Sequence, residues 1–183
     1  MKEPNLKGEK VILRFPLDEI KAELITDYFQ DEDQVRHMTA VPYPYTIQDA
    51  KNFIKFLEAT KEVESTFEWG IFDKETDQFI GMVGLEEIDY DIGKGELGYW
   101  LAKDYWGKGY TKEAATMVLD FAFNELELER VEAYVVKENE PSLRLLESLA
   151  FQVEGLMRRA ALNKGELVDR YVCGILKEEW QRS

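Results

Sequence analysis

The sequence is poor in the residues that build metal centres and disulfide frameworks. Its 183 residues contain one cysteine, Cys173, and one histidine, His37. A single thiol excludes an internal disulfide and any zinc site built on several thiolates. A single histidine excludes His-rich metal centres and leaves one partner for a serine nucleophile. We therefore expect no bound metal, and we expect Cys173, within an apolar run, to be a small buried hydrophobe.

Long apolar runs are also missing. No stretch approaches the roughly 18 residues that a membrane span needs, and the polar segment Met1–Glu9 lacks the apolar core of a signal peptide. The composition is that of an ordinary globular protein, with 45% hydrophobic and 33% charged residues. These features predict a cytoplasmic protein with a single domain, residues 1–183.

Basic residues are scarce, at 23 against 37 acids, which gives a formal net charge of −14. This balance disfavours DNA, RNA and anionic membranes as partners. The excess is uneven, because residues 1–91 hold 21 acids and 10 bases whereas residues 92–183 hold 16 and 13. Two explanations remain open: a solvated surface that aids solubility, or a first half that attracts a cationic ligand.

Hydrophobic periodicity predicts alternating strands and helices, and hence an α/β or α+β sheet with helices packed on its faces. Thr46 has the character of an N-cap for the second helix. Predicted helices cover Asp18–Phe29, Ile47–Thr60, Thr111–Leu126 and Pro141–Leu149. Predicted strands cover Lys10–Phe15, Thr66–Asp73, Gln78–Tyr90, Glu96–Ala102, Arg130–Val136, Phe151–Ala160 and Leu167–Leu176.

A glycine-rich turn separates one strand from an amphipathic helix and carries the clearest functional signal. The segment reads Gly95-Glu96-Leu97-Gly98-Tyr99-Trp100-Leu101, then Trp106-Gly107-Lys108-Gly109-Tyr110-Thr111-Lys112. Glycines allow a ligand to approach the backbone, and the first N–H groups of a helix favour phosphate. The spacing fits neither the Walker A pattern nor the dinucleotide fingerprint. The alternative is an ordinary tight turn, in which the glycines serve the backbone conformation and bind no ligand.

Read as a whole, this segment resembles the acetyl-CoA motif of the GCN5-related N-acetyltransferase (GNAT) superfamily, [QR]-x-x-G-x-[GA]. Trp106 takes the Gln/Arg position, Gly109 the central glycine and Thr111 the last position. The run W-G-K-G-Y-T-K-E-A after G-Y-W resembles the RimJ/RimL-type branch, named for acetyltransferases of ribosomal-protein N-termini. Asn139-Glu140-Pro141-Ser142 and the later Phe151 match the same branch, whereas Ala150 replaces its usual glycine.

The resemblance implies a mixed, splayed sheet of about six or seven strands with helices on both faces, and acetyl-CoA as cofactor. It implies that the pyrophosphate is bound by main-chain amides from Gly107 to Thr111, including Lys108, Gly109 and Tyr110, after the motif residue Trp106. Main-chain groups of Leu101 and Ala102 would pair with pantetheine as an added strand does. Asn139 would bind the pantetheine arm, although an N-cap is its alternative role.

Transfer of acetyl to an amine requires removal of a proton from the amine and benefits from an acid for the thiolate. Glu96 is the predicted base, because some superfamily members carry a catalytic glutamate there; a structural carboxylate is its alternative. Ser142 is the predicted acid, with helix capping as its alternative. On an undistorted strand Glu96, Gly98 and Trp100 share one face. The loop with Tyr43 and Tyr45 is a plausible acceptor wall or ordinary packing.

Three functions follow from this reading. The first is acetyl-CoA-dependent acetylation of a protein N-terminal α-amine; the second uses a small amine such as a polyamine, amino acid or antibiotic; the third is a non-catalytic acyl-CoA sensor. An exposed peptide-sized groove would favour a protein acceptor, and a closed, acid-lined pocket a small polyamine. Expected partners are an amine acceptor, which is a basic protein N-terminus or a small cationic amine, and conceivably a second copy in a homodimer.

Overall fold

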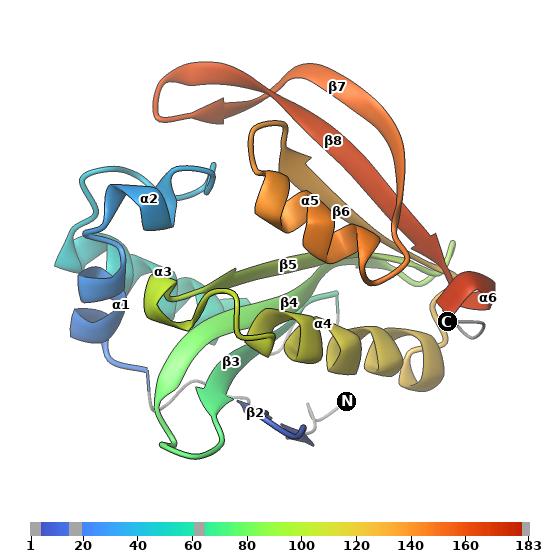
Figure 1. Ribbon diagram of the computed structural model, residues 1–183, viewed down its shortest axis with the longest axis horizontal. Coiled ribbons are helices and arrows are strands. Elements are labelled where there is room, and N and C mark those ends of the chain that lie inside the picture. The colour runs from blue at the N-terminus through green and yellow to red at the C-terminus, as the bar shows by residue number, and fades with distance from the viewer. Residues whose placement is uncertain (1–4, 15–19, 61–64, 181–183) are drawn as a thin grey trace.

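The centre of the protein is one eight-stranded sheet, seen in a computed structural model that describes residues 5–14, 20–60 and 65–180 (Figure 1). Its strand order is β1-β2-β3-β4-β5-β6-β8-β7. Only β5 and β6 run parallel, so the sheet is mixed as expected, with eight strands instead of six or seven. The strands are β1 Leu6–Lys7, β2 Val11–Arg14, β3 Phe67–Asp73, β4 Phe79–Asp89, β5 Lys94–Leu101, β6 Arg130–Val136, β7 Gln152–Asn163 and β8 Glu166–Leu176.

The sheet opens between its two parallel strands. β5 and β6 pair from Lys94 opposite Arg130 to Glu96 opposite Glu132, and their register ends there. β5 continues to Leu101 and β6 to Val136, so the two strands separate toward their carboxyl ends. This is the splayed geometry that the resemblance implies, and it leaves main-chain groups of β5 facing a gap.

Helices cover both faces of the sheet. Because successive side chains of a strand point to opposite faces, β3 and β4 contribute to two separate cores. On one face Phe72 and Met82 pack with the α1–α3 region, and on the other Trp69 and Leu85 pack with α4. The helices are α1 Ala22–Tyr28, α2 Glu32–Val35, α3 Ile47–Thr60, α4 Tyr110–Asp120, α5 Glu140–Glu147 and α6 Lys177–Trp180.

Most predicted elements appear within a few residues of their expected bounds. The expected start of the first helix at Asp18 and the strand end at Phe15 lie outside the described residues. The helix predicted to reach Leu126 is α-helical only to Asp120 and then forms a π-helical turn over Phe121–Glu125. Three consecutive residues of that turn are buried, more than one face of a regular α-helix accommodates. The four-residue helices α2 and α6 and the short β1 are not predicted, because they are too short to show a period.

The end of α5 explains why Ala150 is an unusual residue for its position. Ala150 has φ 66°, the left-handed conformation for which glycine is preferred. The Phe151 N–H turns back to the carbonyl of Leu146 at 3.0 Å and closes the helix. Ala150 therefore holds a backbone conformation that the usual glycine of the family would adopt more easily.

No described helix is long and apolar enough to cross a membrane.

Candidate active site

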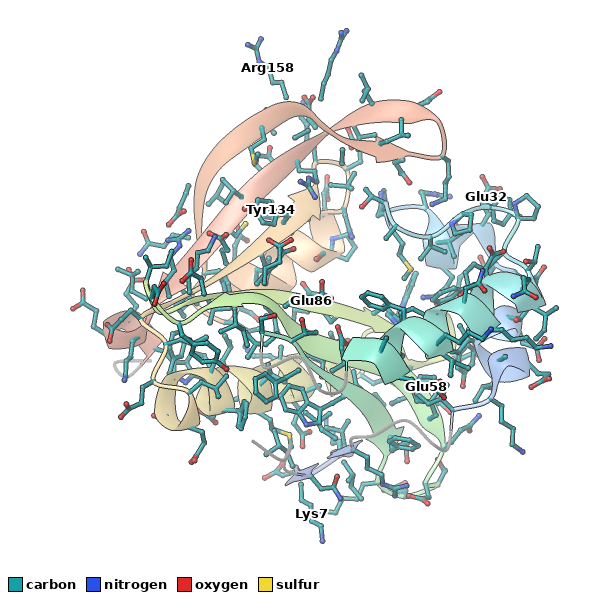
Figure 2. All side chains as sticks on the ribbon, turned by 180° about the vertical axis from the view of Figure 1, so that it is seen from behind. Lys7, Glu32, Glu58, Glu86, Tyr134 and Arg158 are labelled. Carbon is teal, nitrogen blue, oxygen red and sulfur yellow. The ribbon has the colours of Figure 1, made fainter. Side chains whose placement is uncertain are left out.

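A cavity of about 1170 Å³ lies where β5 and β6 separate. Its walls come from the carboxyl half of β5, from β6, from the glycine turn, from the start of α5 and from the α2 region. Figure 2 shows Glu86 of β4 and Tyr134 of β6 projecting toward this opening from its two sides. A cavity at the carboxyl ends of parallel strands has the size and position of a ligand site.

The long β7–β8 hairpin closes over one side of the cavity. It arches above β6 and α5 in Figure 1, and its tip bonds to the segment that follows α2. The Asn163 side chain donates to the Arg36 carbonyl at 2.8 Å, and Lys164 Nζ donates to the carbonyls of Met38 and Val41, each at 3.1 Å. The tip of the hairpin is thus tied to the segment that follows α2.

The glycine turn presents main-chain N–H groups to the cavity. Gly107 and Gly109 have φ of 70° and 85°, a region that side chains disfavour. A Cβ on Gly107 would meet nothing within 4 Å, so space is open beside the turn. Gly109 is the N-cap of α4 and gives no side-chain cap, which leaves the first amides of the helix for a ligand. This cradle suits a phosphate group.

Side chains around the turn hold its shape. Trp106 Nε1 donates to the Leu101 carbonyl at 2.7 Å, and Tyr110 donates its hydroxyl proton to Asp73 at 2.6 Å. Lys108 Nζ donates to the Asp104 carbonyl at 2.8 Å. These side chains are therefore structural supports, and the main chain is the part of the turn that faces the cavity.

At the edge of β5, fewer main-chain N–H and carbonyl groups are free to bind a ligand than the sequence suggests. The Ala102 N–H donates to Ile80 at 2.8 Å, so it belongs to the β4 ladder. The Leu101 carbonyl already accepts from Trp106 and from Gln34 Nε2, the latter at 3.0 Å. Main-chain groups alternate along a strand, so Tyr99 and Leu101 direct their N–H groups toward the gap. For the described residues, the Gln34 Oε1 atom is buried without a partner.

Ser142 meets an unexpected partner at the start of α5. Its hydroxyl lies 2.8 Å from the Tyr99 hydroxyl, which reaches it from β5. Burial raises the pKa of Tyr99 to about 12, so this phenol stays protonated. The Asn139 side chain accepts from the Ser142 N–H at 3.3 Å, which confirms the N-cap role of Asn139. The sequence analysis did not single out Tyr99, because its contact with Ser142 is made between a strand and a helix that are distant in the sequence.

Glu96 lies half-buried at the base of the cavity. The register of β4 and β5 is continuous from Glu86–Glu96 to Gly81–Leu101, so Glu96, Gly98 and Trp100 share one face as expected. Burial raises the pKa of Glu96 to about 7, and the carboxylates of Glu86 and Glu87 add to the rise. A carboxyl with this pKa holds and releases a proton near neutral pH.

Two further carboxyls, absent from the sequence-based site, share this face of the sheet. Glu68 of β3 and Glu86 of β4 line the same cavity as Glu96. Glu68 is 7% exposed, and burial together with the neighbouring Glu86 carboxyl raises its pKa well above the usual range. The only signal in the sequence is a glutamate in the middle of an otherwise apolar strand.

A family model for the acetyltransferase (GNAT) domain matches residues 10–152. The chain belongs to the GNAT acetyltransferase family. The uncharacterized N-acetyltransferase p20 of Bacillus licheniformis is 36% identical to this GNAT protein over 159 residues, 87% of this chain and 89% of p20. The crystal structure of a putative acetyltransferase from T. thermophilus is 29% identical, covers 98% of this chain and 93% of its own, and has a TM-score of 0.84. The spermidine N(1)-acetyltransferase of Escherichia coli is 30% identical over 115 residues, 58% of this chain and 62% of that protein.

Because the chain belongs to this family, it is an acyltransferase.

Two of the remaining predicted residues are buried. In this GNAT protein Tyr45 packs against Phe29, with ring centroids 4.9 Å apart, so Tyr45 belongs to the core. Tyr43 is 44% exposed. Cys173 is buried, and burial raises the pKa of its thiol to about 11, which fits a structural hydrophobe. His37 lines the cavity.

Proposed function

We propose that this protein transfers the acetyl group of acetyl-CoA to the primary amine of a small cationic acceptor, with Glu96 as the base. The observation that carries this proposal is the half-buried Glu96 carboxyl, with a pKa of about 7, between the phosphate-binding cradle and two more acids. A base with that pKa can take the proton that an amine loses as it attacks a carbonyl carbon in the cavity.

The residues present fit acetyl-CoA. The amides from Gly107 to Thr111 would bind the pyrophosphate, and the N–H groups that β5 directs into the gap would pair with pantetheine, together with Asn139. The unpartnered Gln34 Oε1 offers an acceptor for a pantetheine amide. Because Ala102 gives its N–H to the β4 ladder, Leu101 is the stronger of the two β5 contacts. Acetyl-CoA, when bound, supplies the thioester carbonyl that an amine attacks and the sulfur that leaves.

Two side-chain groups then divide the proton transfers. Glu96 accepts the proton that the amine loses as its nitrogen bonds to the acetyl carbon. Ser142 donates a proton to the sulfur as the carbon–sulfur bond breaks, and Tyr99, 2.8 Å from Ser142 and protonated, replaces that proton. Glu96 then releases its proton to solvent and Tyr99 takes one from solvent, so the site returns to its starting state.

Two observations favour a small cation as the acceptor. The tip of the β7–β8 hairpin is tied to the segment after α2, and the carboxyls of Glu68, Glu86 and Glu96 line the cavity. The spermidine-acetylating relative supports the same class. A basic protein N-terminus is the second candidate, supported by the resemblance of the glycine turn and the α5 segment to the RimJ/RimL-type branch. The N-terminal segment of such a protein would have to enter the cavity beneath the β7–β8 hairpin.

An acceptor screen with acetyl-CoA, in which free thiol is measured, tests the proposal. We expect small polyamines to accelerate thiol release more than amino acids or basic N-terminal peptides of the same charge. Faster release with the peptides would favour the protein acceptor. Binding of CoA in calorimetry without acceleration by any amine would support the sensor function and overturn the enzyme assignment.

A further inference from the structure

The part of the cavity wall that follows α2 has little regular structure of its own. Residues 36–41, here called the wall segment, all line the cavity and belong to no helix or strand. Two main-chain bonds shape the segment: the Met38 N–H donates to the Val35 carbonyl at 3.0 Å, and the Val41 N–H donates to the Met38 carbonyl at 3.2 Å. A segment of this kind takes its position largely from the groups that contact it.

The tip of the β7–β8 hairpin supplies contacts along the whole wall segment (Figure 1). The Asn163 side chain donates to the Arg36 carbonyl at 2.8 Å, and Lys164 Nζ donates to the carbonyls of Met38 and Val41, each at 3.1 Å. These bonds join residues that are 123 to 127 positions apart in the sequence. The start, the middle and the end of the wall segment are therefore held by one turn of a distant hairpin.

The backbone of that turn makes Lys164 an unusual residue for its position. Asn163 pairs with Glu166, so Lys164 and Gly165 form a two-residue loop. Their φ values are 48° and 88°, and a type I′ turn requires positive φ at both positions. Glycine, asparagine and aspartate are preferred at the first of them, whereas a long side chain is disfavoured there. A residue held in such a conformation directs attention to what its side chain does.

We propose that Lys164 is a positioning residue for the acceptor, because its ammonium group fixes the wall segment where the acceptor contacts it. Lys164 is not among the described residues that line the cavity, so it acts through Met38 and Val41. None of the residues assigned to acetyl-CoA lies in the wall segment, which leaves this part of the cavity to the acceptor. The inference rests on the proposed function, because it presumes that an acceptor shares the cavity with acetyl-CoA.

Lys164→Asn separates the side-chain bonds from the turn. Asparagine followed by Gly165 is the pair that a type I′ turn favours, so the hairpin should form at least as well. The shorter side chain loses the ammonium donor to Met38 and Val41. With saturating acetyl-CoA, and with 1,4-diaminobutane and glycinamide as acceptor probes, we expect KM for whichever probe reacts to rise about three- to tenfold, the effect of losing exposed charge-assisted bonds. The value of kcat, and the affinity for CoA in calorimetry, should stay the same.

Two further variants serve as controls. Lys164→Arg keeps a cationic donor and should restore most of the wild-type KM. Arg158→Gln removes a positive charge from the same hairpin, but Arg158 projects away from the rest of the protein (Figure 2), so KM should not change. An unchanged KM in Lys164→Asn would overturn the proposal. Loss of CoA affinity together with kcat would indicate a general structural role for Lys164 and would contradict it as well.

Hydrogen exchange tests the wall segment without any acceptor. The amide N–H groups of Met38 and Val41 should exchange about three- to tenfold faster in Lys164→Asn than in the wild-type protein, and at the wild-type rate in Arg158→Gln. If an amine is acetylated but KM does not respond to Lys164→Asn, only the role of Lys164 is wrong. If no amine accelerates thiol release, the proposed function is wrong, and exchange then decides on Lys164: faster exchange supports its hold on the wall segment, and unchanged exchange overturns it.

Discussion

Two buried glutamates, Glu68 of β3 and Glu132 of β6, show how differently the two halves of the sheet treat charge. Their exposed fractions are nearly equal, at 7% and 8%. Lys94 lies 2.7 Å from Glu132, and Arg130 adds a second cation at 3.3 Å. These cations outweigh burial and lower the pKa of Glu132, whereas burial and a second acid raise the pKa of Glu68.

Nearly equal burial therefore leaves the two carboxyls in different protonation states. Where positive partners are built in, a buried acid stays ionised and joins the strands that supply them. Where they are missing, as at Glu68, burial favours the protonated carboxyl, which is hydrogen-bonded to Glu86. Ion-paired acids occur in both halves of the sequence: Asp31, Asp33 and Asp77 before residue 92, and Glu132, Glu140 and Glu154 after it.

The largest effect is expected in the cofactor cradle. Gly109→Glu places a side chain and a negative charge in a turn with φ 85°, and we expect CoA affinity in calorimetry to fall more than about 100-fold. Gly165→Glu is the matched control, because Gly165 has φ 88° in the β7–β8 turn and open space around it. Unchanged CoA affinity in the Gly109 variant would remove the pyrophosphate assignment.

Glu96→Gln should separate activity from stability. Without the base, turnover should fall by about 100-fold or more, and the rise of rate with pH through about 7 should disappear. The folded-state pKa of Glu96 lies above its usual value, so ionisation of Glu96 opposes folding as pH rises. The variant should therefore gain about 1 kcal/mol above pH 7, after solvent screening, and nothing near pH 4.

Wild-type pH–rate behaviour in the Glu96→Gln protein would show that the carboxylate is structural. Turnover measured from pH 5.5 to 9 and thermal unfolding at both pH extremes provide the two readouts. The unfolding data also confirm that any loss of turnover occurs in a folded protein.

Glu132→Gln should lower the free energy of unfolding at neutral pH, where Glu96→Gln should raise it. It leaves Lys94 without its carboxylate and weakens the contact to Arg130, so we expect about 2–3 kcal/mol of unfolding free energy to be lost at pH 7. Because the folded-state pKa of Glu132 is lowered, its contribution is present above the ordinary glutamate pKa and is lost as pH falls through the lowered value. The cost should therefore shrink in acid, as measured by urea unfolding. A cost that does not depend on pH would mean that packing, and not charge pairing, accounts for it.

The smallest effect concerns backbone conformation. Ala150→Gly relieves a left-handed alanine with φ 66° and should stabilise the protein by about 1 kcal/mol in thermal unfolding. Ala161→Gly, within β7, should destabilise by a comparable amount because strand glycine loses more conformational freedom. Loss of stability in the Ala150 variant would mean that the alanine methyl makes contacts that outweigh the strain.

Sequence reasoning identified the elements that carry strong periodicity and the motifs that are contiguous. Arg130–Val136 and Ile47–Thr60 are predicted and observed with identical bounds, and the turn from Gly107 to Gly109 opens a helix as expected. Tyr99 and Glu68 were missed because their significance depends on neighbours from other elements. The contact of Tyr99 with Ser142 depends on how α5 packs against β5, and the proximity of Glu68 to Glu86 depends on strand register, and local sequence patterns encode neither.

Gly84 of β4 and Gly98 of β5 lie opposite each other in the sheet, and this pair has a consequence for how acceptor specificity can change. A Cβ at position 84 would lie less than 3.0 Å from the Glu68 carboxyl, so the end of that side chain would have to move. A Cβ at position 98 would make an ordinary contact of 3.4 Å with Glu86 Oε1. Substitution at position 84 should therefore change the shape of the cavity through Glu68, whereas substitution of a small residue at position 98 should change it little.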